Sequence, residues 1–109
     1  MRFGVHVSTA GGLKLAFPRA AELGCTTMQI FTRNPRGWRF KPLTDEEAET
    51  FTAARAASAI EPVVVHMPYL PNLAAADPEK RDRSISSLAA ELGRAQALGC
   101  EYVVTHLGK

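Results

Sequence analysis

The chain has 109 residues, enough for one domain with a hydrophobic core but short of the ~250 residues of a typical closed α/β barrel. With 46% hydrophobic and 22% charged residues, the composition excludes a disordered or low-complexity chain. The net charge of +2 is uneven, because residues 1–44 hold seven basic residues against one acidic, whereas residues 45–109 hold six against ten. A basic amino-terminal part indicates either an anionic partner or a solvated surface.

Four short hydrophobic segments have the pattern of buried strands. They are Phe3–Ser8, Thr26–Phe31, Pro62–His66 and Tyr102–His106. Three of them place a histidine near the carboxyl end, and Pro68 and Pro71 force the chain out of the sheet after the third.

Three helices are predicted between these strands. The first follows Gly11-Gly12 and ends at Gly24, and Pro18 must lie in its first turns or at a kink. A capping box at residues 44–47 opens the second, with an inner stripe of Ala48, Phe51 and either Ala54 or Arg55. Asp77-Pro78 opens the third, whose apolar face is predicted to be Ile85, Leu88, Ala89, Leu92 and Ala95.

The order β-α-β-α-β-α-β is typical of a parallel sheet, and E-L-G-C at 22–25 is echoed by A-L-G-C at 97–100. In parallel sheets the binding face lies beyond the carboxyl ends of the strands. We therefore expect His6, His66, His106 and the loop after Phe31 to gather there. The pattern alone does not distinguish an open sheet from a barrel.

Converging imidazoles suit zinc or another divalent first-row metal, although a strand histidine is often only a hydrogen-bonded core residue. We predict His66 and His106 as metal ligands, and expect His6 to support a ligand or to contact phosphate. No H-E-x-x-H or C-x-x-C motif completes a zinc site.

The loop after the second strand has four basic residues, Arg33, Arg36, Arg39 and Lys41, interleaved with Trp38 and Phe40. No acidic residue occurs from Leu23 to Thr44. Guanidinium groups pair with phosphates and stack on bases, so the loop is a candidate nucleic-acid edge. Alternatively, the aromatic side chains pack on the core while the basic ones face water.

The two cysteines, Cys25 and Cys100, each follow Leu-Gly and are too few for a disulfide framework, so free thiols in a reducing compartment are expected. The start M-R-F-G-V-H lacks the apolar segment of a signal peptide, and no run approaches the ~20 apolar residues of a membrane span. We expect a cytoplasmic protein.

Five motifs, taken in order, resemble the endonuclease IV family of apurinic/apyrimidinic endonucleases. They are H-V-S-x-A-G-G at 6–12, F-T-x-N-x-R-x-W at 31–38, H-x-x-Y-L-x-N-L at 66–73, R-S-x-x-x-L-x-x-E-L-x-R-x-x-x-L-G at 83–99 and T-H-L-G at 105–108. Residues 1–109 match about the first two-fifths of the family's barrel. The resemblance implies about half of a TIM (β/α)8 barrel, with four strands and three helices.

The resemblance also implies a repair enzyme that binds up to three zinc ions and cuts double-stranded DNA on the 5′ side of abasic sites. His66 and His106 match metal ligands, and Arg36, Tyr69 and Leu70 match residues that contact DNA around the flipped-out abasic nucleotide; no catalytic residue is assigned. Gly37 stands where relatives often carry a larger polar residue. Further zinc ligands of the family lie beyond Lys109, so we expect a truncated piece with little activity alone.

Two alternatives remain open. A sugar isomerase or epimerase barrel also gathers metal ligands at strand ends, although a small sugar needs no row of arginines. The other alternative is a non-catalytic half-barrel that binds DNA or self-associates. Its two open sheet edges predict a homodimer.

Overall fold

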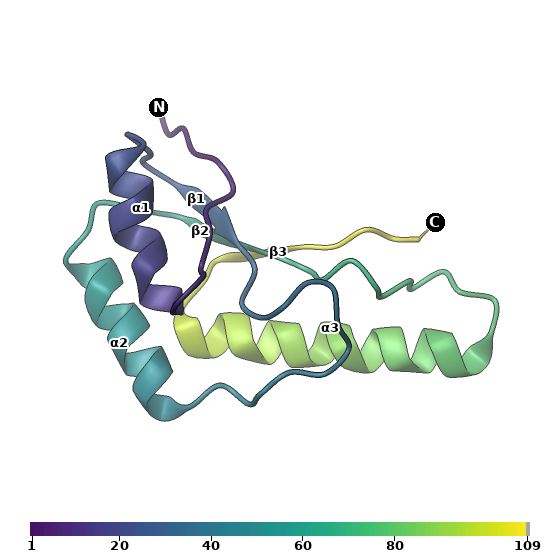
Figure 1. Ribbon diagram of the computed structural model, residues 1–109. Coiled ribbons are helices and arrows are strands. Elements are labelled where there is room, and N and C mark those ends of the chain that lie inside the picture. The colour runs from purple at the N-terminus through teal and green to yellow at the C-terminus, as the bar shows by residue number, and fades with distance from the viewer. Residues whose placement is uncertain (109) are drawn as a thin grey trace.

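The computed structural model describes residues 1–108, which form a three-stranded parallel sheet with three α-helices (Figure 1). The strands are β1 (Met28–Ile30), β2 (Val63–His66) and β3 (Tyr102–Val104), in the order β1-β2-β3. The helices are α1 (Ala16–Glu22), α2 (Asp45–Ala56) and α3 (Pro78–Leu98). From the first helix on, the predicted alternation of helices and strands is confirmed, while β1 and β3 are shorter than predicted and His106 lies just beyond β3.

The first predicted strand, Phe3–Ser8, does not form one, so the sheet has three strands and not four. The segment runs parallel to β1 and pairs with it at one bridge, between His6 and Gln29. At Gly4 the backbone passes so close to Thr27 that an added Cβ would lie 1.9 Å from its carbonyl oxygen. The Val7 N–H donates to the Gln29 carbonyl and the Gln29 N–H donates to the Val5 carbonyl, and these two bonds keep His6 beside the sheet.

The amino-terminal part of the first predicted helix is a 3₁₀ helix, Leu13–Leu15, and α1 continues from it. Pro18 is the third residue of α1, within the first turn, where the backbone N–H groups have no partner inside the helix. Its missing N–H therefore costs no α-helical hydrogen bond. The helix ends before Gly24, which has a φ of 77°.

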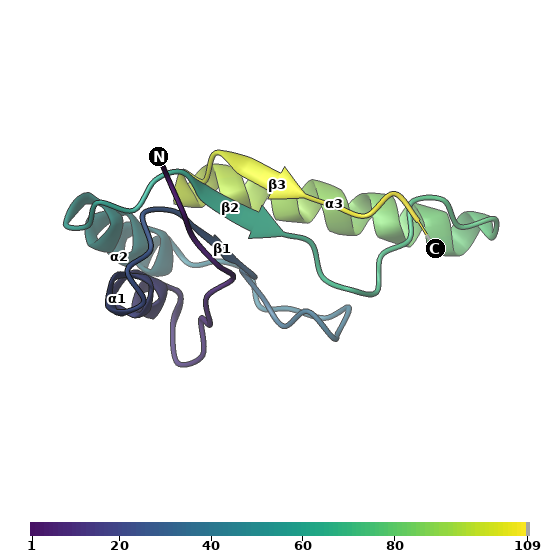
Figure 2. The same cartoon turned by 90° about the horizontal axis from the view of Figure 1, so that it is seen from above.

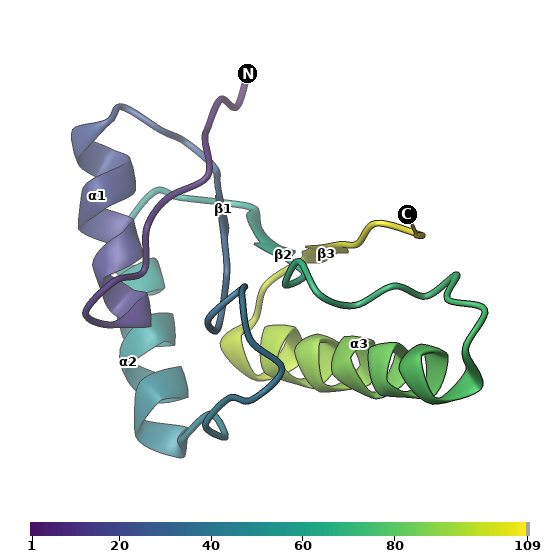
Figure 3. The same cartoon turned by 45° about the vertical axis from the view of Figure 1, so that its right-hand side comes forward.

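All three helices lie on one side of the sheet (Figure 3). Phe51 of α2 is fully buried and packs against Phe17 of α1, with the ring centroids 4.8 Å apart and the ring planes tilted by 57°. Val63 and Val65 of β2 point into the same core. The capping box predicted for α2 is present, since the Thr44 hydroxyl accepts from the N–H of Glu47 and the Glu47 side chain accepts from Thr44.

The predicted apolar face of α3 is wrong. Ile85 and Leu92 are each 51% exposed, and of the five residues only Ala95 is buried. The buried face of α3 consists of Ser84, Ser87, Glu91, Arg94, Ala95 and Leu98. The helix turns its polar side inward because the loop between β1 and α2 brings charged partners to it, as described below.

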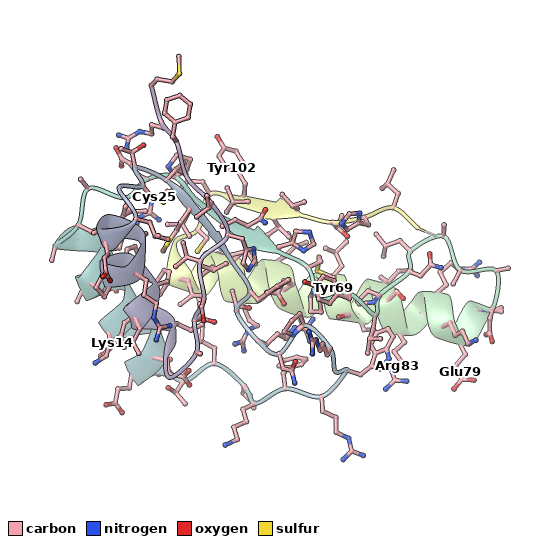
Figure 4. The ribbon with its side chains drawn as sticks, turned by 45° about the horizontal axis from the view of Figure 1, so that its top comes forward. Lys14, Cys25, Tyr69, Glu79, Arg83 and Tyr102 are labelled. Atoms are coloured by element: carbon pink, nitrogen blue, oxygen red, sulfur yellow. The ribbon has the colours of Figure 1, made fainter. Side chains whose placement is uncertain are left out.

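Among residues 1–108, no helix covers the other face of the sheet. Tyr102, 60% exposed, projects from β3 away from the helices (Figure 4). Within residues 1–108, no helix combines the length and the apolar character needed to cross a lipid bilayer.

Candidate metal and nucleic-acid site

The three histidines gather at the carboxyl end of the sheet, toward which all three strands point (Figure 2). The ring centroids of His66 and His106 are 5.3 Å apart. The Phe31 ring contacts both His6 and His66, with ring-centroid distances of 4.4 Å and 5.4 Å. The predicted convergence is confirmed, and it follows from parallel strands that end at the same edge.

Hydrogen bonds define the state of two imidazoles. Nδ1 of His66 lies 2.6 Å from the carbonyl oxygen of Met67, so this nitrogen is protonated and donates to that oxygen, and Nε2 takes no part in the bond. Nδ1 of His6 lies 3.0 Å from the amide nitrogen of Gln29 and accepts its hydrogen bond. Burial, and secondarily the neighbouring His66, lower the pKa of His6, which favours the neutral ring.

A ligating histidine commonly donates its second ring N–H to a carbonyl or carboxylate, and His66 has this arrangement. His66 therefore suits a ligand position of a zinc site, and His106, with its ring centroid 5.3 Å away, is a second candidate. Among residues 1–108, no group of three or more His, Cys, Asp or Glu side chains is placed to hold a metal ion. Two imidazoles fall short of the three or four protein ligands that zinc usually has.

The loop after β2 brings Tyr69 to the histidines. Its ring lies 5.3 Å from that of Phe31 and 6.5 Å from that of His66. The Tyr69 N–H donates to the carbonyl oxygen of Pro35 at 2.9 Å, which fastens this loop to the segment that carries Arg36. Tyr69 and His106 also line a cavity of 340 Å³.

A buried charge cluster holds the loop between β1 and α2 against α3. Glu91 is fully buried, and Arg33 Nε donates to its carboxylate at 2.7 Å. Thr32 donates its hydroxyl hydrogen to the same carboxylate. Arg94 donates to the Thr32 hydroxyl at 2.9 Å and to the Thr32 carbonyl at 2.5 Å. The cluster joins residues 58 to 62 positions apart in the sequence.

An aromatic side chain closes this charge cluster. The guanidinium groups of Arg33 and Arg94 lie 4.1 and 5.6 Å from the ring centroid of Phe40. Burial lowers the pKa of Arg94, while the neighbouring Glu91 opposes that shift. Arg33 thus supports the loop from inside and is not free to contact a nucleic acid.

The sequence interpretation treated Arg33 as one of four equivalent surface residues, and it missed Glu91 and Arg94. The available signal was the spacing of the polar residues in the third helix. Ser84, Ser87, Glu91 and Arg94 recur every three or four residues, which is the spacing of one helix face. The prediction instead used the apolar residues of the same helix, such as Ile85 and Leu92, to assign its buried face.

Comparisons with known proteins agree with this architecture. Residues 17–109 match the AP endonuclease 2 family model, described as a xylose isomerase-like TIM barrel. The chain belongs to this family. It is 52% identical over 108 residues to a probable endonuclease 4 of Methanosphaerula palustris, covering 99% of the chain and 38% of that protein. A probable endonuclease 4 of Methanoculleus marisnigri is 54% identical over 105 residues, covering 96% and 37%.

A solved relative supports the same family at the level of structure. The crystal structure of endonuclease IV from Thermus thermophilus superposes with a TM-score of 0.93 at 45% identity, covering 99% of this chain and 40% of that one. The resemblance to endonuclease IV and the partial TIM barrel are therefore confirmed. The chain spans about two-fifths of the length of these AP endonuclease 2 family members.

Proposed function

We propose that this chain forms the amino-terminal part of a DNA repair endonuclease of the endonuclease IV type, which hydrolyses the phosphodiester bond 5′ to an abasic site. The main support is the rim where His66 and Tyr69 pack against Phe31 and His106 packs against His66, beside the loop that carries Arg36. The similarity to proteins called probable endonuclease 4 supports the same reaction class.

In this proposal, His66 and His106 bind zinc. Zinc held there would supply activation of a water molecule and neutralisation of charge on the phosphate. His66 contributes Nε2, because its Nδ1–H is bound to Met67. Because residues 1–108 hold no group of three or more His, Cys, Asp or Glu side chains placed to bind a metal, we expect the 109-residue chain alone to cut abasic DNA little or not at all.

In the same proposal, Arg36, Tyr69 and Leu70 contact the damaged duplex. Tyr69 is 54% exposed and Leu70 36% exposed, although both are large and partly apolar. Extruding a nucleotide costs a few kcal/mol of stacking, which such contacts offset. Within residues 1–108, the Arg36 side chain has no hydrogen-bond or ion-pair partner, so its donors are available for phosphate.

Fluorescence anisotropy tests the DNA contacts, using a duplex with a tetrahydrofuran abasic analogue and its intact counterpart. Arg36→Ala is expected to weaken binding to the abasic duplex and to reduce the preference over intact duplex. Arg81→Ala is the charge-matched control, because Arg81 is exposed on α3. Equal losses of affinity in both variants would mean that Arg36 contributes only non-specific electrostatic attraction.

Titration with zinc alone tests the metal ligands. We expect the unchanged chain to bind zinc with a shift of the His66 and His106 ring resonances, and His66→Asn or His106→Asn to remove that binding. Gln29→Ala, which removes the partner of His6 but neither ligand, should retain it. Zinc binding that survives both histidine substitutions would contradict the assignment.

Self-association is a further part of the proposal. Large apolar side chains are exposed at three places: Ile85 and Leu92 on α3, Phe3 and Val5 beside β1, and Tyr102 on the sheet. Open strand edges and apolar patches favour pairing between copies. Size-exclusion chromatography over a range of concentrations should show a dimer, and a stable monomer throughout would contradict it.

A further inference from the structure

A second basic surface lies on α3, beyond the rim that contains the histidines. Two adjoining hollows of 280 Å³ each meet there, and both are lined by Trp38 and Arg83. Lys80 and Leu70 line one of them, and Arg39 lines the other. Neither hollow is lined by an Asp or Glu side chain among the described residues.

Arg83 is held in a defined position on this surface. Its guanidinium carbon lies 4.4 Å from the ring centroid of Trp38, which is the geometry of a cation–π stack. Stacking fixes the plane of the guanidinium and leaves the N–H groups at its edge free. Within residues 1–108 those groups have no hydrogen-bond or ion-pair partner, in contrast to Arg33 and Arg94.

The surface is continuous with the proposed DNA-contacting rim. Leu70 lines the hollow beside Lys80, and Trp38 follows Arg36 by two residues in the same loop. In Figure 4, Arg83 and Tyr69 lie on the same half of the molecule, opposite Cys25 and Lys14. A duplex seated on the rim therefore has a path across the helix toward Arg83.

We propose that Arg39, Lys80 and Arg83 form a phosphate-contacting track for the backbone of the same DNA duplex, with Trp38 as the support for Arg83. This inference rests on the proposed function, because it extends that DNA-binding face. Phosphate is the group that suits the track, since a planar guanidinium pairs with two of its oxygens and Lys adds a point charge. Such contacts position a duplex without reading its bases or its damage.

The test measures the salt dependence of binding to intact and to abasic duplex by fluorescence anisotropy. Each lost phosphate contact reduces the magnitude of the negative slope of log K against log salt by about 0.9, which is about eightfold in affinity at 0.1 M salt relative to 1 M. Arg83→Ala is expected to show this loss equally on both duplexes. Arg83→Lys should recover part of it, and Arg81→Ala, on another face of the same helix, is the charge-matched control.

Far-UV circular dichroism establishes that each variant is folded. An Arg83→Ala slope equal to that of Arg81→Ala would overturn the track, and so would a loss confined to the abasic duplex. The proposed function is tested separately by the preference for abasic over intact duplex. If the unchanged chain shows no preference for abasic duplex but Arg83→Ala still reduces the salt dependence, the repair assignment is refuted and the phosphate-contacting track is retained.

Discussion

Replacing Glu91 with glutamine should destabilise the fold and release the loop between β1 and α2. Glu91 is fully buried, and the Arg33 side chain paired with it is 3% exposed. The neutral amide keeps the shape of the carboxylate, but it leaves two guanidinium groups without a counter-charge and turns an N–H toward a donor. Breaking a buried pair in this way costs roughly 3–5 kcal/mol.

That cost is a large share of a total stability of about 5–15 kcal/mol. For a chain of this size, it should lower the urea midpoint by about 2 M with little change in the slope m. Urea unfolding followed by far-UV circular dichroism measures it. Glu49→Gln, at an exposed position of α2, is the control and should stay within about 0.5 kcal/mol.

Loop release has a separate optical signal, because Trp38 is the single tryptophan and lies in that loop. In the Glu91→Gln variant, acrylamide should quench Trp38 more strongly before the helices melt. A stability loss below about 1 kcal/mol with unchanged quenching would refute the reasoning, since the loop would then be held by aromatic packing and not by charge.

Three further predictions concern the core and the ionisable groups. Phe51→Ala should cost about 3–5 kcal/mol of unfolding free energy, measured in urea, because a fully buried ring is lost. Burial raises the pKa of Cys100 to about 12, so at pH 8 only on the order of 10⁻⁴ of the thiol is ionised. A thiol reagent should therefore label Cys100 in the folded chain very slowly. Fast labelling of a Cys25→Ser variant, in which Cys100 is the remaining cysteine, would contradict this. Burial opposes the ionisation of Glu101, but hydrogen bonds from Arg55 and a backbone N–H lower its pKa below 4.5 overall. Because the folded-state pKa is the lower one, the carboxylate stabilises the fold above pH 4.5 and this contribution is lost as the pH falls through the folded pKa; Glu101→Gln should flatten the acid limb of stability against pH.

Local signals in the sequence were sufficient for much of the fold. The capping box at Thr44 and the Asp77-Pro78 start of α3 were predicted correctly, because capping depends on residues within one turn. The gathering of His66 and His106 also followed from strand direction alone.

Long-range contacts decided the rest. The inner face of α3 depends on Arg33, which approaches Glu91 only once the loop has folded over the helix, so hydrophobic periodicity selected the wrong side. The close approach of Gly4 to Thr27 is likewise a contact between segments distant in the sequence, which no local pattern encodes. The metal and DNA roles of the rim residues stay predictions until the experiments above are done.

The crossing at Gly4 makes the candidate site sensitive to a position that carries no chemistry. Even a methyl group there meets Thr27 at 1.9 Å, so any other amino acid must push the amino-terminal segment away from β1. His6 is two residues further along and would swing out of its stack on Phe31. A systematic mutational scan should therefore find Gly4 as intolerant of replacement as the imidazole whose position it sets.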